Sequence, residues 1–113
     1  MKLLNGLAAL VAGMSFSVGA LTYAADFPEK PVRFVVPFPP GGGTDALARI
    51  LGGKLAEYWG QQVIVENNPG ANNQLAAEYV AKSPNDGTVL FIGPEVTFTV
   101  NPSLYPKLGY DPV

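Results

Sequence analysis

The chain has 113 residues, with 7 basic and 9 acidic side chains, and contains neither cysteine nor histidine. Within this chain those absences exclude disulfides, thiolate metal sites and a conventional zinc or Ser-His catalytic centre, so we expect no metal and no cofactor. A net charge of −2 without a clustered basic face gives no indication of a nucleic-acid partner. A single small domain is the most that this length supports.

Residues 1–24 have the three-part layout of a secretory signal peptide. A lysine provides the positive charge, Leu3–Val18 is almost entirely apolar or small, and small residues follow that suit cleavage after Ala24 or Ala25. The apolar stretch is shorter than the ~20 residues that a membrane-spanning helix needs. The pattern therefore predicts a mature domain over 25–113, located in a bacterial periplasm and without a stable membrane anchor after cleavage.

The mature part alternates between strand-like and helix-like segments. Short, apolar, β-branched runs predict strands over Val32–Val36, Gln62–Glu66 and Thr88–Gly93. Helical patterns fill the intervals, over Ala46–Gly60 and Gln74–Ser83. Short connections of this kind form right-handed crossovers between parallel strands. The predicted fold class is therefore α/β, a parallel-sheet βαβαβ unit covered by helices.

The first predicted helix carries an apolar stripe that we expect to face the sheet. Its members recur at spacings of three and four: Leu47, Ile50, Leu51, Leu55, Tyr58 and Trp59. Gly52 and Gly53 lie inside this helix, where each costs roughly 1 kcal/mol relative to alanine. The helix therefore either packs closely at these glycines or bends there, and Gly60 is placed to end it.

The stretch "VPFPPGGGTD" after the first strand has more glycine than a turn requires. Three consecutive glycines let the backbone come close to a ligand, and the free amides and dipole of the next helix favour an anion. Thr44 or Asp45 is a plausible cap of that helix. Ligands of parallel sheets bind beyond the carboxyl ends of the strands. Three loops qualify, over Pro37–Asp45, Asn67–Asn73 and Gly93–Thr97.

The type of anion admits alternatives. Gly41–Ala46, "GGGTDA", also satisfies the dinucleotide-binding pattern, and Glu66 stands about where a ribose-binding acid would lie. Against a dinucleotide-binding enzyme, two prolines stiffen the entry to the loop, and an exported protein meets little NAD. No acid pair or activated nucleophile stands out, so we expect no enzyme. A small carboxylate needs only a few amide donors and fits better, while a small structural or regulatory envelope protein is a further alternative.

The chain resembles the solute-binding receptors of tripartite tricarboxylate transporters, the TctC or Bug family. The resemblance rests on four motifs in combination, "PFPPGGGTD", "VENNPGA", "DGTVL" and "NPSLYPKLGYDPV", and covers essentially all of the mature part. It implies a two-lobed, type II-like periplasmic binding protein that closes on a small carboxylate and delivers it to integral-membrane permease components. Family ligands include di- and tricarboxylates, acidic amino acids and aromatic carboxylates.

The resemblance also implies positions for the site. Backbone amides of the first loop and the Thr44 hydroxyl would bind the carboxylate, directly or through ordered water, and Asp45 would cap the helix rather than touch the ligand. Phe38 would line the pocket wall, with a core position as the alternative. The residues implied are Phe38, Gly41, Gly42, Gly43 and Thr44 in the first loop, and Gly70, Asn72 and Thr97 in the others.

This chain departs from the family in three respects. Asn72 and Asn73 stand where Gly-Gly is common, although asparagine tolerates positive φ better than other non-glycine residues. Pro94 and Glu95 replace small polar residues, and a Glu95 carboxylate pointing into the pocket would repel an acid. Family members are also much longer, so the resemblance implies that the second lobe is absent and that the chain is an N-terminal portion with half a binding site.

Overall fold

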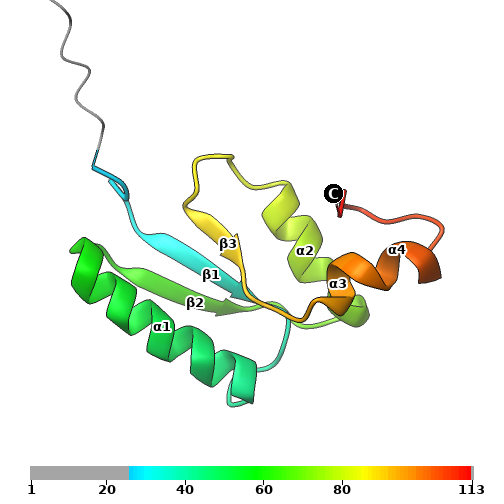
Figure 1. The fold of residues 1–113 in the computed structure, drawn as a ribbon, viewed down its shortest axis with the longest axis horizontal. Helices are drawn as coiled ribbons and strands as arrows, with labels where there is room; N and C mark the ends of the chain where they lie inside the picture. The colour runs from blue at the N-terminus through cyan, green and yellow to red at the C-terminus, as the bar shows by residue number, and fades with distance from the viewer. Residues whose placement is uncertain (1–25, 113) are drawn as a thin grey trace, which may run out of the picture.

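The computed structural model describes residues 26–112 (Figure 1). The predicted signal peptide lies outside the described residues. The elements in chain order are β1 (Val32–Val36), α1 (Gly43–Trp59), β2 (Val63–Asn67), the turn η1 (Ala71–Asn73), α2 (Gln74–Ala81), β3 (Val89–Phe91), α3 (Val96–Thr99) and α4 (Asn101–Leu104). Among the helices of this described part, none combines the length and the hydropathy needed to cross a membrane.

The three strands form one parallel sheet in the order β2-β1-β3, which confirms the predicted α/β class. The register places Val32 beside Val63 and Arg33 beside Val89. The central strand β1 is buried most completely, because it has a strand on each side and a helix over each face. Strand β3 is shorter than the predicted Thr88–Gly93, and α3 and α4 were not predicted from the sequence.

The two long helices cover opposite faces of the sheet (Figure 1). Helix α1 packs on the face that carries Val32, Phe34 and Val36, and these side chains form the core cluster together with Ala48. Helix α2 lies against β3 and β1 on the other face. Because both crossovers start beyond the carboxyl ends of strands, the loops of the candidate site gather at one edge of the sheet.

Most of the apolar stripe predicted for α1 faces solvent, so that prediction is wrong. Leu47, Ile50, Leu51 and Tyr58 are exposed, with 67% of Ile50 and 86% of Tyr58 accessible. Only Leu55 and Trp59 of the predicted stripe pack against the core, and the row that faces the sheet is completed by Ala48 and Gly52. Small residues at two of these positions let the helix approach the strands closely, which a ranking by hydrophobicity does not reveal.

The two internal glycines of α1 have different surroundings. A Cβ added to Gly52 would stand 3.0 Å from Val63 Cγ1, whereas one added to Gly53 would meet nothing within 4 Å. Close packing therefore explains Gly52 and does not explain Gly53. The helix ends as predicted at Gly60, which has φ 66° and donates its N–H to the Ala56 carbonyl.

Candidate functional site

The glycine loop after β1 is exposed and leaves space above its backbone. An added Cβ would meet nothing within 4 Å at Gly41, Gly42 or Gly43. Gly41 has φ 97°, a conformation that favours glycine, whereas Gly42 has φ −81° and ψ 173°, which any residue adopts. Neither backbone conformation nor packing within the described chain therefore explains glycine at Gly42 and Gly43.

Helix α1 begins at Gly43 with amide donors that no side chain caps. The first helical bond runs from Ala46 N–H to the Gly42 carbonyl at 2.9 Å. The amides of Gly43 and Thr44 therefore have no acceptor inside the helix, and the helix dipole adds partial positive charge there. The expectation that Thr44 or Asp45 caps this helix was wrong, because Gly42 occupies the N-cap and the Asp45 carboxylate bonds to the loop instead.

Four of the predicted site residues line one concavity of about 440 Å³. Phe38, Gly42, Gly43 and Thr44 surround it together with two prolines, Pro39 and Pro40. Phe38 is half-buried and combines both roles considered for it, since it packs against the core cluster and also lines the concavity. An apolar wall beside amide donors suits a small organic acid.

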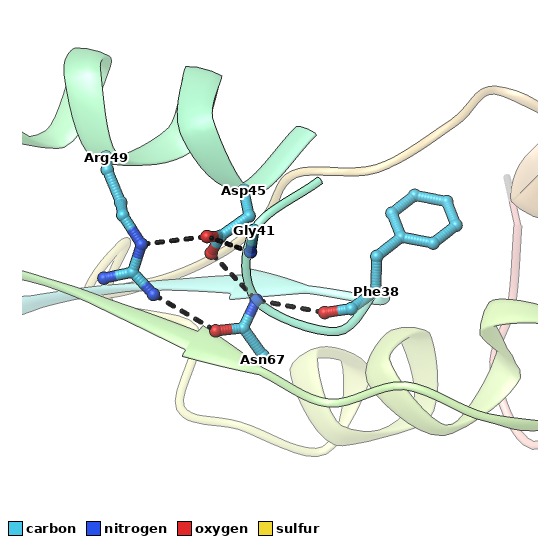
Figure 2. A network of polar contacts seen from close by, with 5 residues as sticks. All are labelled: Phe38, Gly41, Asp45, Arg49 and Asn67. Carbon is cyan, nitrogen blue, oxygen red and sulfur yellow. Dashed lines mark hydrogen bonds and ion pairs between the residues drawn. The ribbon is translucent and has the colours of Figure 1, made fainter. Parts of the chain in front are cut away.

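Behind the loop, Asp45 is the centre of a polar network (Figure 2). The residue is only 3% exposed, and its Oδ2 accepts from Gly41 N–H at 2.9 Å and from Arg49 Nε at 3.0 Å. Its Oδ1 accepts from Asn67 Nδ2 at 2.9 Å. The Arg49 guanidinium, followed by the Gly41 amide and the Asn67 side chain, holds the pKa of this carboxyl well below its usual range.

Sequence reasoning did not assign the partners of Asp45. Arg49 follows at the i,i+4 spacing that allows an ion pair on a helix, so this contact had a local signal. Asn67 is the last residue of β2 and pairs in register with Val36. Only the parallel pairing of β1 and β2 brings it to Asp45.

The second loop follows an unusual backbone path. Four consecutive residues have positive φ: Gly70 at 128°, Ala71 at 48°, Asn72 at 51° and Asn73 at 70°. The prediction that asparagine would accept this turn is thus confirmed. The Asn72 side chain does not line the glycine-loop concavity, because it donates to Asn101 Oδ1 at 2.9 Å and to the Tyr105 hydroxyl oxygen at 3.4 Å.

The third loop leads into α3, where Thr97 is fully buried. Its Oγ1 is a buried polar atom without a hydrogen-bond partner in the part of the chain that the structure describes. The Thr97 carbonyl accepts from the Tyr110 hydroxyl at 2.5 Å. Glu95 is exposed at the start of α3. Neither Thr97 nor Gly70 lines the glycine-loop concavity.

The acid considered for ribose binding is occupied by a partner. Arg33 donates to both carboxylate oxygens of Glu66, with Nε at 2.7 Å and Nη2 at 2.6 Å, and its guanidinium lies 5.5 Å from the centre of the Tyr79 ring. A ribose-binding acid needs a free carboxylate beside the glycine loop. The Arg33–Glu66 pair therefore argues against the dinucleotide alternative.

The fold of this chain matches part of solved periplasmic proteins. One such structure, described as a periplasmic transporter, aligns over 77% of this chain and 29% of its own length, with a TM-score of 0.72 and 40% identity. The chain belongs to the TctC family, described as the tripartite tricarboxylate transporter family receptor, whose family model matches residues 47–113. This is a family of transport receptors and not of enzymes, as predicted.

Individual relatives agree with this assignment. A UPF0065 protein from the tcbD-tcbE intergenic region of Pseudomonas sp. (strain P51) is 43% identical over 84 residues, covering 74% of this chain and 25% of the relative. Two solved proteins of Rhodopseudomonas palustris, Rpa4515 with adipate and MatC with bound malate, are each 42% identical. They have TM-scores of 0.71 and 0.70, and each alignment covers 76% of this chain and 29% of the relative.

The chain spans only part of the curated relatives that it matches. Its matches cover between 25% and 33% of their length. The family and the fold are therefore established for this chain, and the ligand and partners of a whole receptor are matters for proposal.

Proposed function

We propose that this chain forms part of the N-terminal lobe of an extracytoplasmic receptor that captures a small carboxylate for a tripartite tricarboxylate transporter. The observation that supports this most is the start of α1 beside the concavity, where the amides of Gly43 and Thr44 have no acceptor within the helix. Adipate and malate, found with two relatives, are both dicarboxylates. A dicarboxylate of that size is the first ligand to test.

In this proposal the amides of Gly42, Gly43 and Thr44 and the Thr44 hydroxyl hold one carboxylate, directly or through ordered water. Gly41 supplies the turn, since its N–H already bonds to Asp45. The apolar wall comes from Phe38. The three residues expected from the second and third loops, Gly70, Asn72 and Thr97, do not line the concavity, so we propose no contact with this carboxylate for them.

The strength of binding follows from the number of donors. A charge-assisted hydrogen bond contributes about 1.5–3 kcal/mol, so two or three give several kcal/mol before the cost of association. Micromolar affinity needs about 8 kcal/mol net. We therefore expect this chain alone to bind in the millimolar range, and the receptor with its second lobe to bind much more tightly.

We place the receptor in the periplasm, with the integral-membrane permease components of the transporter as its partners. The solved periplasmic relatives support this location. The signal-peptide pattern of residues 1–24 supports it as well, although those residues lie outside the described part. The intact mass of the product recovered from the periplasm tests both export and cleavage.

The decisive experiment is a titration of the ¹⁵N-labelled chain with malate and adipate, followed by amide chemical shifts. We expect the Gly42, Gly43 and Thr44 amides to move together and to saturate, while dimethyl malate, which lacks the charge, leaves them in place. Gly42→Val and Gly43→Val put side chains into open space, so these variants should fold and lose the response.

Gly53→Ala is the matched control, since it fills a second open glycine position of the same helix away from the loop. Its response to malate should equal that of the parent chain. An unchanged response in both valine variants would refute the proposed site, and no response to any carboxylate in the parent chain would refute the proposed function.

A further inference from the structure

One side-chain amide joins the glycine loop to the end of the neighbouring strand (Figure 2). Asn67 Nδ2 donates to the Phe38 carbonyl at 3.0 Å and to Asp45 Oδ1 at 2.9 Å. Phe38 opens the loop, Asp45 lies in the first turn of α1, and Asn67 ends β2. The loop is thereby held at both of its ends.

The orientation of this amide is determined by Arg49. Its Nη2 donates to Asn67 Oδ1 at 3.3 Å while its Nε donates to Asp45 Oδ2 at 3.0 Å. Because a cation can only donate, the amide oxygen must face Arg49, and the amide nitrogen must face Phe38 and Asp45. Donors and acceptors therefore match at every contact of the network.

The contact between Asp45 and Gly41 determines where the loop turns. Oδ2 of Asp45 accepts the Gly41 N–H at 2.9 Å, and Gly41 adopts φ 97° at that point. The next residues run into the start of α1, where the described part of the chain provides no side-chain cap for the amide donors. The partners of Asp45 are a loop amide, a helix side chain and a strand-end side chain, and none belongs to the buried core cluster.

We propose that Asp45, together with Asn67 and Arg49, acts as a positioning group that fixes the glycine loop and so aims the amides of Gly43 and Thr44 at the ligand. This inference rests on the proposed function for its consequence in binding. Asp45 itself does not touch the ligand. Asp45 carries the same charge as the proposed ligand, yet it can lie close to the ligand site because its carboxylate oxygens accept hydrogen bonds from Gly41, Arg49 and Asn67.

The test is Asp45→Asn, which keeps the shape of the side chain but replaces one of its acceptor oxygens by an NH2 donor. That donor would face the Gly41, Arg49 and Asn67 groups, which all donate to the carboxylate in the parent chain. We expect the Gly41 amide to exchange with solvent about tenfold faster or more, the effect of losing a charge-assisted bond. Exchange of the β1 amides should not change. Malate should bind about tenfold more weakly, read from the Gly43 and Thr44 shifts of the full chain.

Glu57→Gln is the matched control, because it removes one negative charge and one exposed ion pair, with Lys54, from the same helix. It should leave both readouts unchanged. Asn67→Ala is the second variant in case Asp45→Asn does not fold. It should weaken malate binding while the β1 amides stay protected.

The outcomes separate this inference from the function on which it rests. Unchanged Gly41 exchange in Asp45→Asn, or unchanged malate affinity in a folded Asp45→Asn or Asn67→Ala chain, would overturn the positioning role. A third outcome is possible, in which Gly41 exchanges faster in Asp45→Asn but the unchanged parent chain shows no response to malate. This outcome would support the role of Asp45 in fixing the loop and would refute the proposed carboxylate binding.

Discussion

Replacing the two adjacent glycines of α1 by alanine tests how closely this helix approaches the sheet. The substitutions are chemically identical and one residue apart, and both reduce the conformational freedom of the unfolded chain equally. In the folded chain they differ, because a Cβ at Gly52 meets Val63 and Phe34, whereas one at Gly53 meets nothing within 4 Å. Any difference in stability therefore reports on the packing contact.

The magnitudes follow from those distances. Alanine gains about 1 kcal/mol over glycine in a helix interior, and Gly53→Ala should show that full gain. At Gly52 the new Cβ would lie 3.0 Å from Val63 Cγ1 and 3.7 Å from Phe34 Cδ2. Carbon atoms prefer about 3.5–4.0 Å, and overpacking of this kind costs about 1–3 kcal/mol. Gly52→Ala should therefore be neutral or destabilising, and less stable than Gly53→Ala by about 1–3 kcal/mol.

Urea unfolding followed by Trp59 fluorescence measures this difference. Trp59 is the single tryptophan and packs against the core cluster, so its emission reports on the contact between α1 and the sheet. The double variant Gly52→Ala/Val63→Ala should lose less free energy of unfolding than the sum of the losses in the two single variants. The reason is that Val63→Ala removes the methyl groups that the new Cβ would meet. Equal stabilisation by both glycine substitutions would refute the close approach of α1.

Three other outcomes are expected. Glu95→Gln should raise malate affinity about twofold at low salt and have no effect at high salt, because Glu95 is an exposed like charge in the third loop, which follows the carboxyl end of β3; calorimetry at two salt concentrations checks this. Asp86 pairs with Lys30 at 2.6 Å and its pKa is lowered, so the free energy of unfolding should decrease as the pH falls below about 5, and Asp86→Asn should flatten that decrease in urea titrations at several pH values. Tyr58→Ser should change the free energy of unfolding by less than about 0.5 kcal/mol, because that side chain is 86% exposed; thermal unfolding would contradict the exposed stripe if it showed a large loss.

The order and direction of the strands were predictable because local patterns determine them. β-Branched runs, helix-length intervals and short connections are sufficient to define a parallel βαβαβ unit, and the observed strands lie within a few residues of the predicted ones. The buried face of α1 was not predictable in the same way. Two periodic rows compete on this helix, and the row that packs contains Ala48 and Gly52, whose advantage is close approach rather than hydrophobicity.

The exposed glycine loop before a helix was predictable from the sequence and its support was not, while its role in binding stays a proposal. Exposed glycines before a helix have a local signature, whereas Asn67 reaches Asp45 across 22 residues and only after β1 and β2 pair. The short helices α3 and α4 were missed because four-residue helices depend on tertiary contacts, such as those of Asn101 with Asn72, more than on local propensity.

The bridge made by Asn67 has a consequence for attempts to change which acid such a receptor prefers. The strand end after β2 and the glycine loop share hydrogen bonds at Phe38 and Asp45, so neither segment is an independent module. If the glycine loop of a relative were transplanted without the strand-end residue that holds it there, the new loop would be held by the strand-end residue of the receiving protein. That residue was not selected for the shape of the new loop. Under the proposed function, an exchange of specificity therefore needs both segments to be grafted together.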